Sequence, residues 1–210
     1  MKKITSIFLV AVLYGCGSSV SPVDQGLIDQ VMHIGNGSEP QGLDPHIVTG
    51  VPEHHLLITM CEGLTISNPE GGANLPGMAE SWEISEDGKT YIFNIRKDAK
   101  WSNGDDFLAE DMVWSWMRVL TPSLGSQYPD MLYYVVGAEE FNTGVITDFS
   151  KVGVKAIDAK TLEVKLKNPT PFFLGLLSHY STWPVHKETV LEFGEIDDRQ
   201  GLWTRPGNFV

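Results

Sequence analysis

The sequence predicts a mixed α/β fold, and the prediction depends on two strand patterns and one helix pattern. Residues 90–96 and 161–167 alternate apolar and polar side chains with the period of two that marks a half-buried strand. Between them, apolar residues recur on a single helix face, at Met112, Val113, Trp116 and Leu120. The chain has 210 residues, which is enough for one or two domains with a sizeable core.

The first third of the chain carries a strand pattern, a loop and a helix pattern. Gln30–Ile34 is predicted to form the first strand, which Gly35-Asn36-Gly37 closes, and the non-periodic residues 38–46 are predicted to form an ordered loop. Apolar spacing from Pro52 onward predicts a helix that ends at Gly63. A short strand over 64–67 and a run of turns over 68–74 follow.

The centre of the chain predicts a hairpin and then an amphipathic helix. Asp87-Gly88 is a tight-turn signal, so Trp82–Ser85 and Thr90–Arg96 are expected to pair as a two-stranded ribbon. The helix is expected to begin at Ala109. Because Leu108 offers no capping oxygen, Asp105 or Asp106 is expected to cap it.

The last third predicts helices around a second hairpin. Pro122 ends the central helix, and residues 131–142 are expected to form another. Residues 152–157 and 161–167 are predicted to pair, with Leu162, Val164 and Leu166 facing inward. Two further helices are expected within 171–180 and over His186–Phe193.

The N-terminus has the pattern of an export signal. Lys2 and Lys3 precede an apolar run over 4–13 that is too short for a transmembrane helix but suits a secretory signal. The following residues, Leu13-Tyr14-Gly15-Cys16, resemble a bacterial lipobox, which predicts a lipoprotein signal peptide over 1–16 with lipid attached to Cys16. Ordinary secretion with cleavage near Gly17-Ser18 is the alternative. The small polar residues 17–30 are predicted to be a tether.

Charge and cysteine content narrow the function classes. The formal net charge is −12, which argues against nucleic acid as a partner and against adhesion to anionic lipid headgroups. Cys16 and Cys61 are the two cysteines, so a lipidated Cys16 leaves no disulfide. Cys61 stands among apolar residues and is predicted to be a buried, unreactive thiol.

Several clustered motifs point to one family. In order, they are Ala79-Glu80-Ser81-Trp82-Glu83, Asp87-Gly88-Lys89-Thr90, Phe93-Asn94-Ile95-Arg96-Lys97, Lys100-Trp101-Ser102-Asn103-Gly104 and Ala109-Glu110-Asp111-Met112-Val113-Trp114-Ser115-Trp116. Together they resemble the peptide/nickel-type solute-binding proteins, the extracytoplasmic receptors of ABC importers, and oligopeptide-binding proteins in particular.

The resemblance implies a two-lobed clamshell of the type II periplasmic-binding-protein fold, of which this chain would be an N-terminal fragment. Residues 31–61 would begin lobe I, 62–185 would form an inserted small lobe, and 186–210 would return to lobe I. The lobe that closes over the ligand would lie outside the chain. The implied partners are an oligopeptide, the ABC permease and the membrane through the lipid anchor, with a monomeric receptor in the periplasm or at the cell surface.

The resemblance also implies a ligand site. Thr49, Gly50 and Val51 match a tripeptide of the family that pairs with the bound peptide, and Tyr128 matches a tyrosine whose hydroxyl reaches the ligand backbone. Pro52 biases Val51 toward extended backbone, and Gly50 lacks a Cβ, so a peptide could approach as an added strand. From composition alone, residues 49–51 would instead be an ordinary loop and Tyr128 a packing tyrosine.

The sequence leaves two alternatives to this function. A related receptor for dipeptides, murein peptides or a nickel chelate is the nearest alternative, and a lipid-anchored hydrolase is a distant one. No cofactor and no metal site are expected, because the adjacent His54 and His55 diverge on a helix and neither has a ligand at i+4. No nucleophile elbow or phosphate-binding loop appears, so the chain is not expected to be an enzyme.

Overall fold

The computed structural model describes residues 20–210, which divide into two units. The first unit ends at Gly37, and its described part holds one helix, α1 (Pro22–Asp29). Ser21 caps α1, since its hydroxyl accepts a hydrogen bond from the Asp24 amide at 3.1 Å, and Pro22 occupies the first turn. A helix therefore lies within the predicted tether, and the Ser-Pro start was a signal for it.

One predicted strand is absent. Gln30–Ile34 forms no strand, and its apolar side chains Val31, Met32 and Ile34 are exposed. A strand requires a neighbour that accepts its backbone hydrogen bonds, and no strand of the described residues pairs with this segment. The prediction of a first strand is wrong for this chain.

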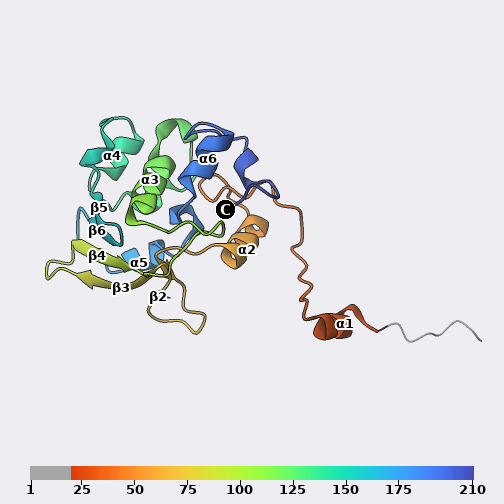
Figure 1. The fold of residues 1–210 in the computed structure, drawn as a ribbon. Helices are drawn as coiled ribbons and strands as arrows, with labels where there is room; N and C mark the ends of the chain where they lie inside the picture. The colour runs from red at the N-terminus through yellow and green to blue at the C-terminus, as the bar shows by residue number, and fades with distance from the viewer. Residues whose placement is uncertain (1–19) are drawn as a thin grey trace, which may run out of the picture. The chain divides into compact units, whose positions relative to one another are not determined.

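The second unit, Ser38–Val210, is built on a four-stranded antiparallel sheet (Figure 1). The strand order is β3-β4-β6-β5, formed by β3 (Ala79–Ile84), β4 (Thr90–Ile95), β6 (Thr161–Lys165) and β5 (Val154–Asp158). The two predicted hairpins are thus confirmed, and they lie side by side through the β4–β6 pairing. A small second sheet joins β1 (Thr65–Ile66) to β2 (Leu75–Pro76).

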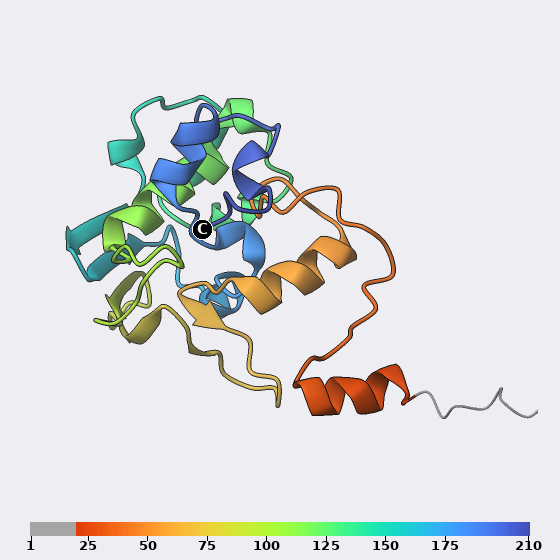
Figure 2. The ribbon, with the colours of Figure 1, turned by 45° about the vertical axis from the view of Figure 1, so that its right-hand side comes forward.

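The helices lie around this sheet. The predicted central helix is α3 (Ala109–Leu120), which contacts β5 and β6. The other α-helices described in this unit are α2 (Val51–Met60), α4 (Ala138–Asn142), α5 (Phe173–Leu176) and α6 (Lys187–Phe193). Figure 2 shows α2 running beside the segment that follows α5. No helix of the described residues is long and apolar enough to cross a membrane.

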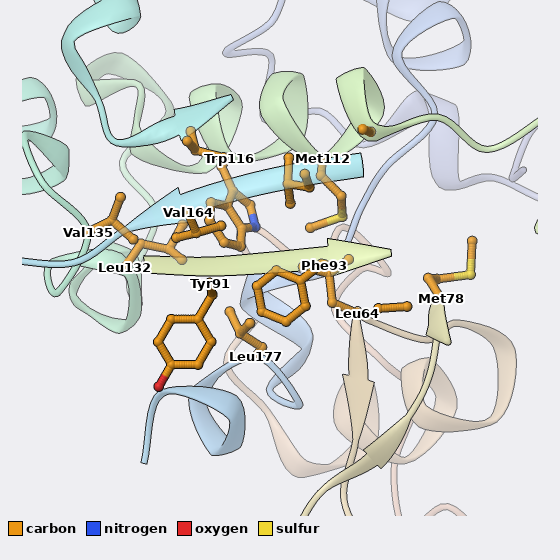
Figure 3. Packing of buried hydrophobic residues seen from close by; sticks show 14 of the residues in the cluster. Leu64, Met78, Tyr91, Phe93, Met112, Trp116, Leu132, Val135, Val164 and Leu177 are labelled. Atoms are coloured by element: carbon orange, nitrogen blue, oxygen red, sulfur yellow. The ribbon is translucent and has the colours of Figure 1, made fainter. Parts of the chain in front are cut away.

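The main core fills the space between α3 and the sheet. Figure 3 shows Met112 and Trp116 of α3 in one cluster with Tyr91 and Phe93 of β4 and Val164 of β6. The inward direction predicted for Leu162, Val164 and Leu166 is confirmed, since all three are buried. Trp116 is fully buried and donates its indole N–H to the Thr182 carbonyl at 2.9 Å, which ties α3 to the segment after α5.

Two local predictions are corrected. Residues 131–142 form a 3-10 turn (Pro129–Leu132) and the short α4 instead of one helix, because Gly137 adopts the left-handed conformation (φ 72°) between them. Neither Asp105 nor Asp106 caps α3. The Asp111 carboxylate instead accepts the Leu108 amide at 2.8 Å, while Asp106 pairs with Lys100.

Candidate functional site

A buried ion pair holds the loop that leads into the candidate site. The Arg118 guanidinium on α3 makes a two-pronged contact with Asp44, with Nη1–Oδ1 at 2.9 Å and Nη2–Oδ2 at 2.6 Å. Both side chains are almost fully buried, so the pair is formed out of water. The Asp44 carbonyl in turn accepts the amides of Ile47 and Val48 at 3.0 and 3.1 Å, which folds the loop into a turn just before Thr49.

Arg118 also reaches two other segments. It donates from Nη1 to His46 Nδ1 at 3.0 Å and from Nε to the Ile196 carbonyl at 3.0 Å. Because Nδ1 of His46 accepts this hydrogen bond, Nε2 carries the proton and donates to the Trp183 carbonyl at 2.9 Å. The loop before the site, α3 and the last segment of the chain are therefore joined at one side chain.

The buried imidazole makes stability depend on pH. Burial, reinforced by the Arg118 guanidinium, lowers the pKa of His46 from 6.5 to about 4. Between these values the unfolded chain binds a proton that the folded chain does not. We therefore expect stability to be greatest above pH 6.5 and to fall as the pH drops toward 4, by up to about 1.4 kcal/mol per pH unit.

Urea unfolding at pH 7.5, 6.5, 5.5 and 4.5 measures this effect. In a His46→Gln variant, the free energy of unfolding should fall less steeply as the pH decreases, because the variant lacks the imidazole that binds a proton on unfolding. An equal slope in the two proteins would show that His46 does not cause it.

The structure places the predicted contact segment at the surface. Thr49 and Val51 are exposed, and Gly50 stands between them in extended backbone (φ −85°, ψ 156°). The extended stretch is shorter than predicted, because Val51 is already the first residue of α2. Pro52 is compatible with that position, since a first-turn residue needs no amide hydrogen.

Gly50 has a role that differs from the predicted one. The space where a Cβ would stand is occupied by the carboxylate of Glu53, whose Cδ is 2.9 Å from that position. Glu53 is 4% exposed and accepts the Gln41 amide at 2.6 Å. Glycine at this position thus makes room for a buried side chain of α2, on the side of the segment that faces the interior.

Tyr128 lies in the same region as this segment. Its ring makes edge contacts with His179 and Tyr180, at centroid distances of 5.1 and 6.3 Å. Tyr128 and Val48 both pack on a small cluster formed by Leu57, Tyr180 and Trp183. The structure therefore packs Tyr128 on the same cluster as Val48, the residue that directly precedes the segment 49–51.

Tyr180 was not predicted from the sequence, although it contacts both Val48 and Tyr128. Its hydroxyl donates to the Val48 carbonyl at 3.1 Å, and its ring lies 5.6 Å from that of His54. Burial, followed by Tyr128, raises the pKa of Tyr180 to about 12, so the hydroxyl remains a donor at neutral pH. No local pattern around Tyr180 marks it, because the Val48 contact spans more than a hundred residues.

Removal of the Tyr180 hydroxyl should loosen residues 48–51 without unfolding the protein. We expect Tyr180→Phe to lower the free energy of unfolding by about 1 kcal/mol, the typical value of one hydrogen bond. Amide exchange of residues 48–51 should accelerate, because the Val48 carbonyl loses its donor. Tyr91→Phe is a matched control in a different region, where the hydroxyl donates to Thr170 at 3.3 Å. Equal exchange at 48–51 in both variants would contradict the assignment.

A cavity of about 930 Å³ adjoins this region. His54 and Ile58 of α2 line it, as do Cys61 just after the helix and three tryptophans, Trp101, Trp183 and Trp203. None of Thr49, Gly50, Val51 and Tyr128 lines it. Burial raises the pKa of Cys61 to about 11, in keeping with the predicted unreactive thiol, although the side chain is only half-buried.

No group of three or more His, Cys, Asp or Glu side chains in residues 20–210 is arranged to hold a metal ion. Cys16 and the predicted signal peptide over 1–16 lie outside the described residues.

Comparisons with known proteins find a family model and several bacterial relatives that match the chain. The sequence model for "Bacterial extracellular solute-binding proteins, family 5 Middle" matches residues 75–210. The periplasmic oligopeptide-binding protein OppA of Escherichia coli is 46% identical over 179 residues, which cover 83% of this chain and 31% of that protein. OppA of Salmonella typhimurium is 39% identical, over 96% of this chain and 36% of that protein. The chain thus spans about a third of the length of these relatives.

The fold agrees with this relationship. The crystal structure of Haemophilus influenzae OppA in complex with RPPGFSPFR matches 82% of this chain and 33% of that chain, with 38% identity and a TM-score of 0.74. The predicted type II periplasmic-binding-protein fold is therefore confirmed for the part of the chain that aligns. The matched proteins are described as binding proteins, in agreement with the expectation that the chain is not an enzyme.

Proposed function

Because the chain belongs to family 5 of the bacterial extracellular solute-binding proteins, we propose that it forms part of an extracytoplasmic receptor that binds oligopeptides and delivers them to an ABC permease. The observation that supports this function best is that Tyr128 packs on the same cluster as Val48, which directly precedes the exposed segment Thr49–Val51. In this proposal the backbone of the segment pairs with the peptide backbone, and the Tyr128 hydroxyl adds a side-chain contact. Recognition of this kind does not distinguish between most neutral side chains of the bound peptide.

The proposal includes the division into lobes. Residues 31–61 and 186–210 would belong to lobe I and residues 62–185 to the inserted small lobe, with the closing lobe in a longer protein. Arg118 lies in the proposed small lobe, and its contacts support the grouping of the outer segments, since this one side chain reaches both Asp44 and the carbonyls of Ile196 and Asp198. The two outer segments thus meet at the same place, as parts of one lobe would.

Calorimetry tests the binding proposal. The protein expressed from its complete reading frame should release or absorb heat with a pool of tripeptides to pentapeptides and should melt at a higher temperature in their presence. Peptide recovered unchanged after incubation would exclude the hydrolase. If native mass spectrometry recovered only dipeptides, murein peptides or a nickel chelate, a related receptor would replace the oligopeptide proposal.

The anchor is proposed separately. Lipid on Cys16 would hold a monomeric receptor at the membrane, in the periplasm or at the cell surface, and the supporting observation is the lipobox-like Leu13–Cys16. Cys16→Ser should release the protein from the membrane fraction and remove the mass of the lipid. Export of an unlipidated protein cut near Gly17 would instead favour ordinary secretion.

A further inference from the structure

We infer that Glu53 sets the charge preference of the proposed peptide site, so that a cationic group on a ligand near Gly50 is favoured and an anionic one is disfavoured. The inference rests on the proposed function, because it concerns the ligand of that same site. Glu53 would act as a specificity-determining residue from behind the segment, without touching the ligand.

The Glu53 carboxylate is a buried negative charge with few compensating partners. Its side chain is 4% exposed, and the Gln41 amide donates to Oε1 at 2.6 Å. Oε2 has no hydrogen-bond partner among the described residues. No lysine, arginine or histidine of residues 20–210 forms an ion pair with Glu53. A charge in such surroundings acts over a longer distance than one that is exposed to water.

The N-terminus of α2 offsets only part of this charge. Glu53 lies in the first turn of α2, whose amide groups carry roughly half a positive elementary charge in total. Gly50, at the cap position, contributes no side chain to these amides. About half a negative charge therefore remains uncompensated at the start of the helix.

Only the backbone of Gly50 separates this charge from the proposed ligand. The carboxylate occupies the place of the missing Cβ on one side of Gly50, and the exposed Thr49 and Val51 flank it. Of the neighbouring rings, those of Tyr180 and His179 add no positive charge at neutral pH. Tyr180 is a neutral phenol, and burial together with His54 lowers the pKa of His179. The net charge of −12 acts in the same direction as Glu53.

The test compares wild type with Glu53→Gln, which removes the charge and keeps the shape. Its matched control is Glu80→Gln, an equal change of net charge at an exposed position on β3. The ligands are nine tripeptides, each tri-alanine with Lys, Gln or Glu at one position, titrated calorimetrically into the protein from the complete reading frame. The readout is the ratio of the Kd values for the Glu and Lys peptides at each position.

At one position the wild type should bind the Lys peptide more tightly than the Glu peptide, and Glu53→Gln should reduce that ratio about tenfold. Glu80→Gln should leave it unchanged. A purely structural defect would weaken the binding of all nine peptides alike and would leave the Kd ratios of the Glu and Lys peptides unchanged.

Two results would overturn the inference while the proposed function stands. In the first, Glu53→Gln binds the Gln peptides, and its ratio of Kd values for the Glu and Lys peptides equals that of the wild type. The other is equal affinity of the wild type for Lys and Glu peptides at every position, which is decisive even if Glu53→Gln does not fold. Absence of binding of all nine peptides to the wild type would overturn the proposed function and this inference together.

Discussion

Arg118→Met is expected to lower the free energy of unfolding by about 3–5 kcal/mol, the range for removal of one partner of a buried ion pair. The substitution leaves the Asp44 carboxylate buried without its cation. It also removes the donors to His46 Nδ1 and to the Ile196 carbonyl. Chemical unfolding monitored by tryptophan fluorescence measures the loss.

Two controls separate the buried pair from an exposed one. Lys100→Met breaks the exposed pair with Asp106 and should leave stability unchanged within error. Asp44→Leu combined with Arg118→Met should recover part of the loss, because the buried charge then disappears with its partner. If Arg118→Met were no more destabilising than Lys100→Met, the buried pair would not hold the loop before the site.

Gly50→Ala is expected to disturb the segment Thr49–Val51 more than the addition or removal of a methyl group at any other position of this segment. The backbone at Gly50 is open to any residue (φ −85°), so the effect comes from space alone: the new methyl overlaps the Glu53 carboxylate. We expect a loss of about 1–3 kcal/mol in stability, as for overpacking elsewhere. Peptide affinity should fall about tenfold or more, because the segment has to move.

Gly42→Ala is the matched control in the preceding loop. A Cβ there meets only Val48, at an ordinary 3.6 Å, so its effect should stay within about 0.5 kcal/mol. The double variant Gly50→Ala, Glu53→Ala should be more stable than Gly50→Ala, since the second change vacates the space. If the double variant were the less stable of the two, Glu53 would not be the residue in conflict.

The elements that could be predicted are those whose partners are close in sequence. The hairpins β3–β4 and β5–β6 follow from alternation and short turns, and α3 follows from its apolar face. The strand expected over Gln30–Ile34 failed because alternation alone does not supply a pairing partner. The helix expected over 131–142 failed because Gly137 interrupts it.

The site could be predicted only in part. Thr49, Gly50, Val51 and Tyr128 came from the family resemblance, and the structure packs Tyr128 on the same cluster as Val48, next to the segment 49–51. Glu53, Tyr180 and Arg118 were not singled out, since their roles depend on contacts with Gln41, Val48 and Asp44. Polar residues of this kind look like solvated side chains in a sequence until the fold buries them.

In the proposed function, the ligand is held through its backbone. Calorimetry with tri-alanine peptides N-methylated at one amide at a time tests this claim directly, because the methyl group removes one backbone donor. We expect at least one N-methylation to weaken binding about tenfold or more, whereas replacement of an alanine by serine or leucine should change affinity only about threefold or less. Tight binding of every N-methylated peptide, together with large effects of the neutral side-chain changes, would contradict it.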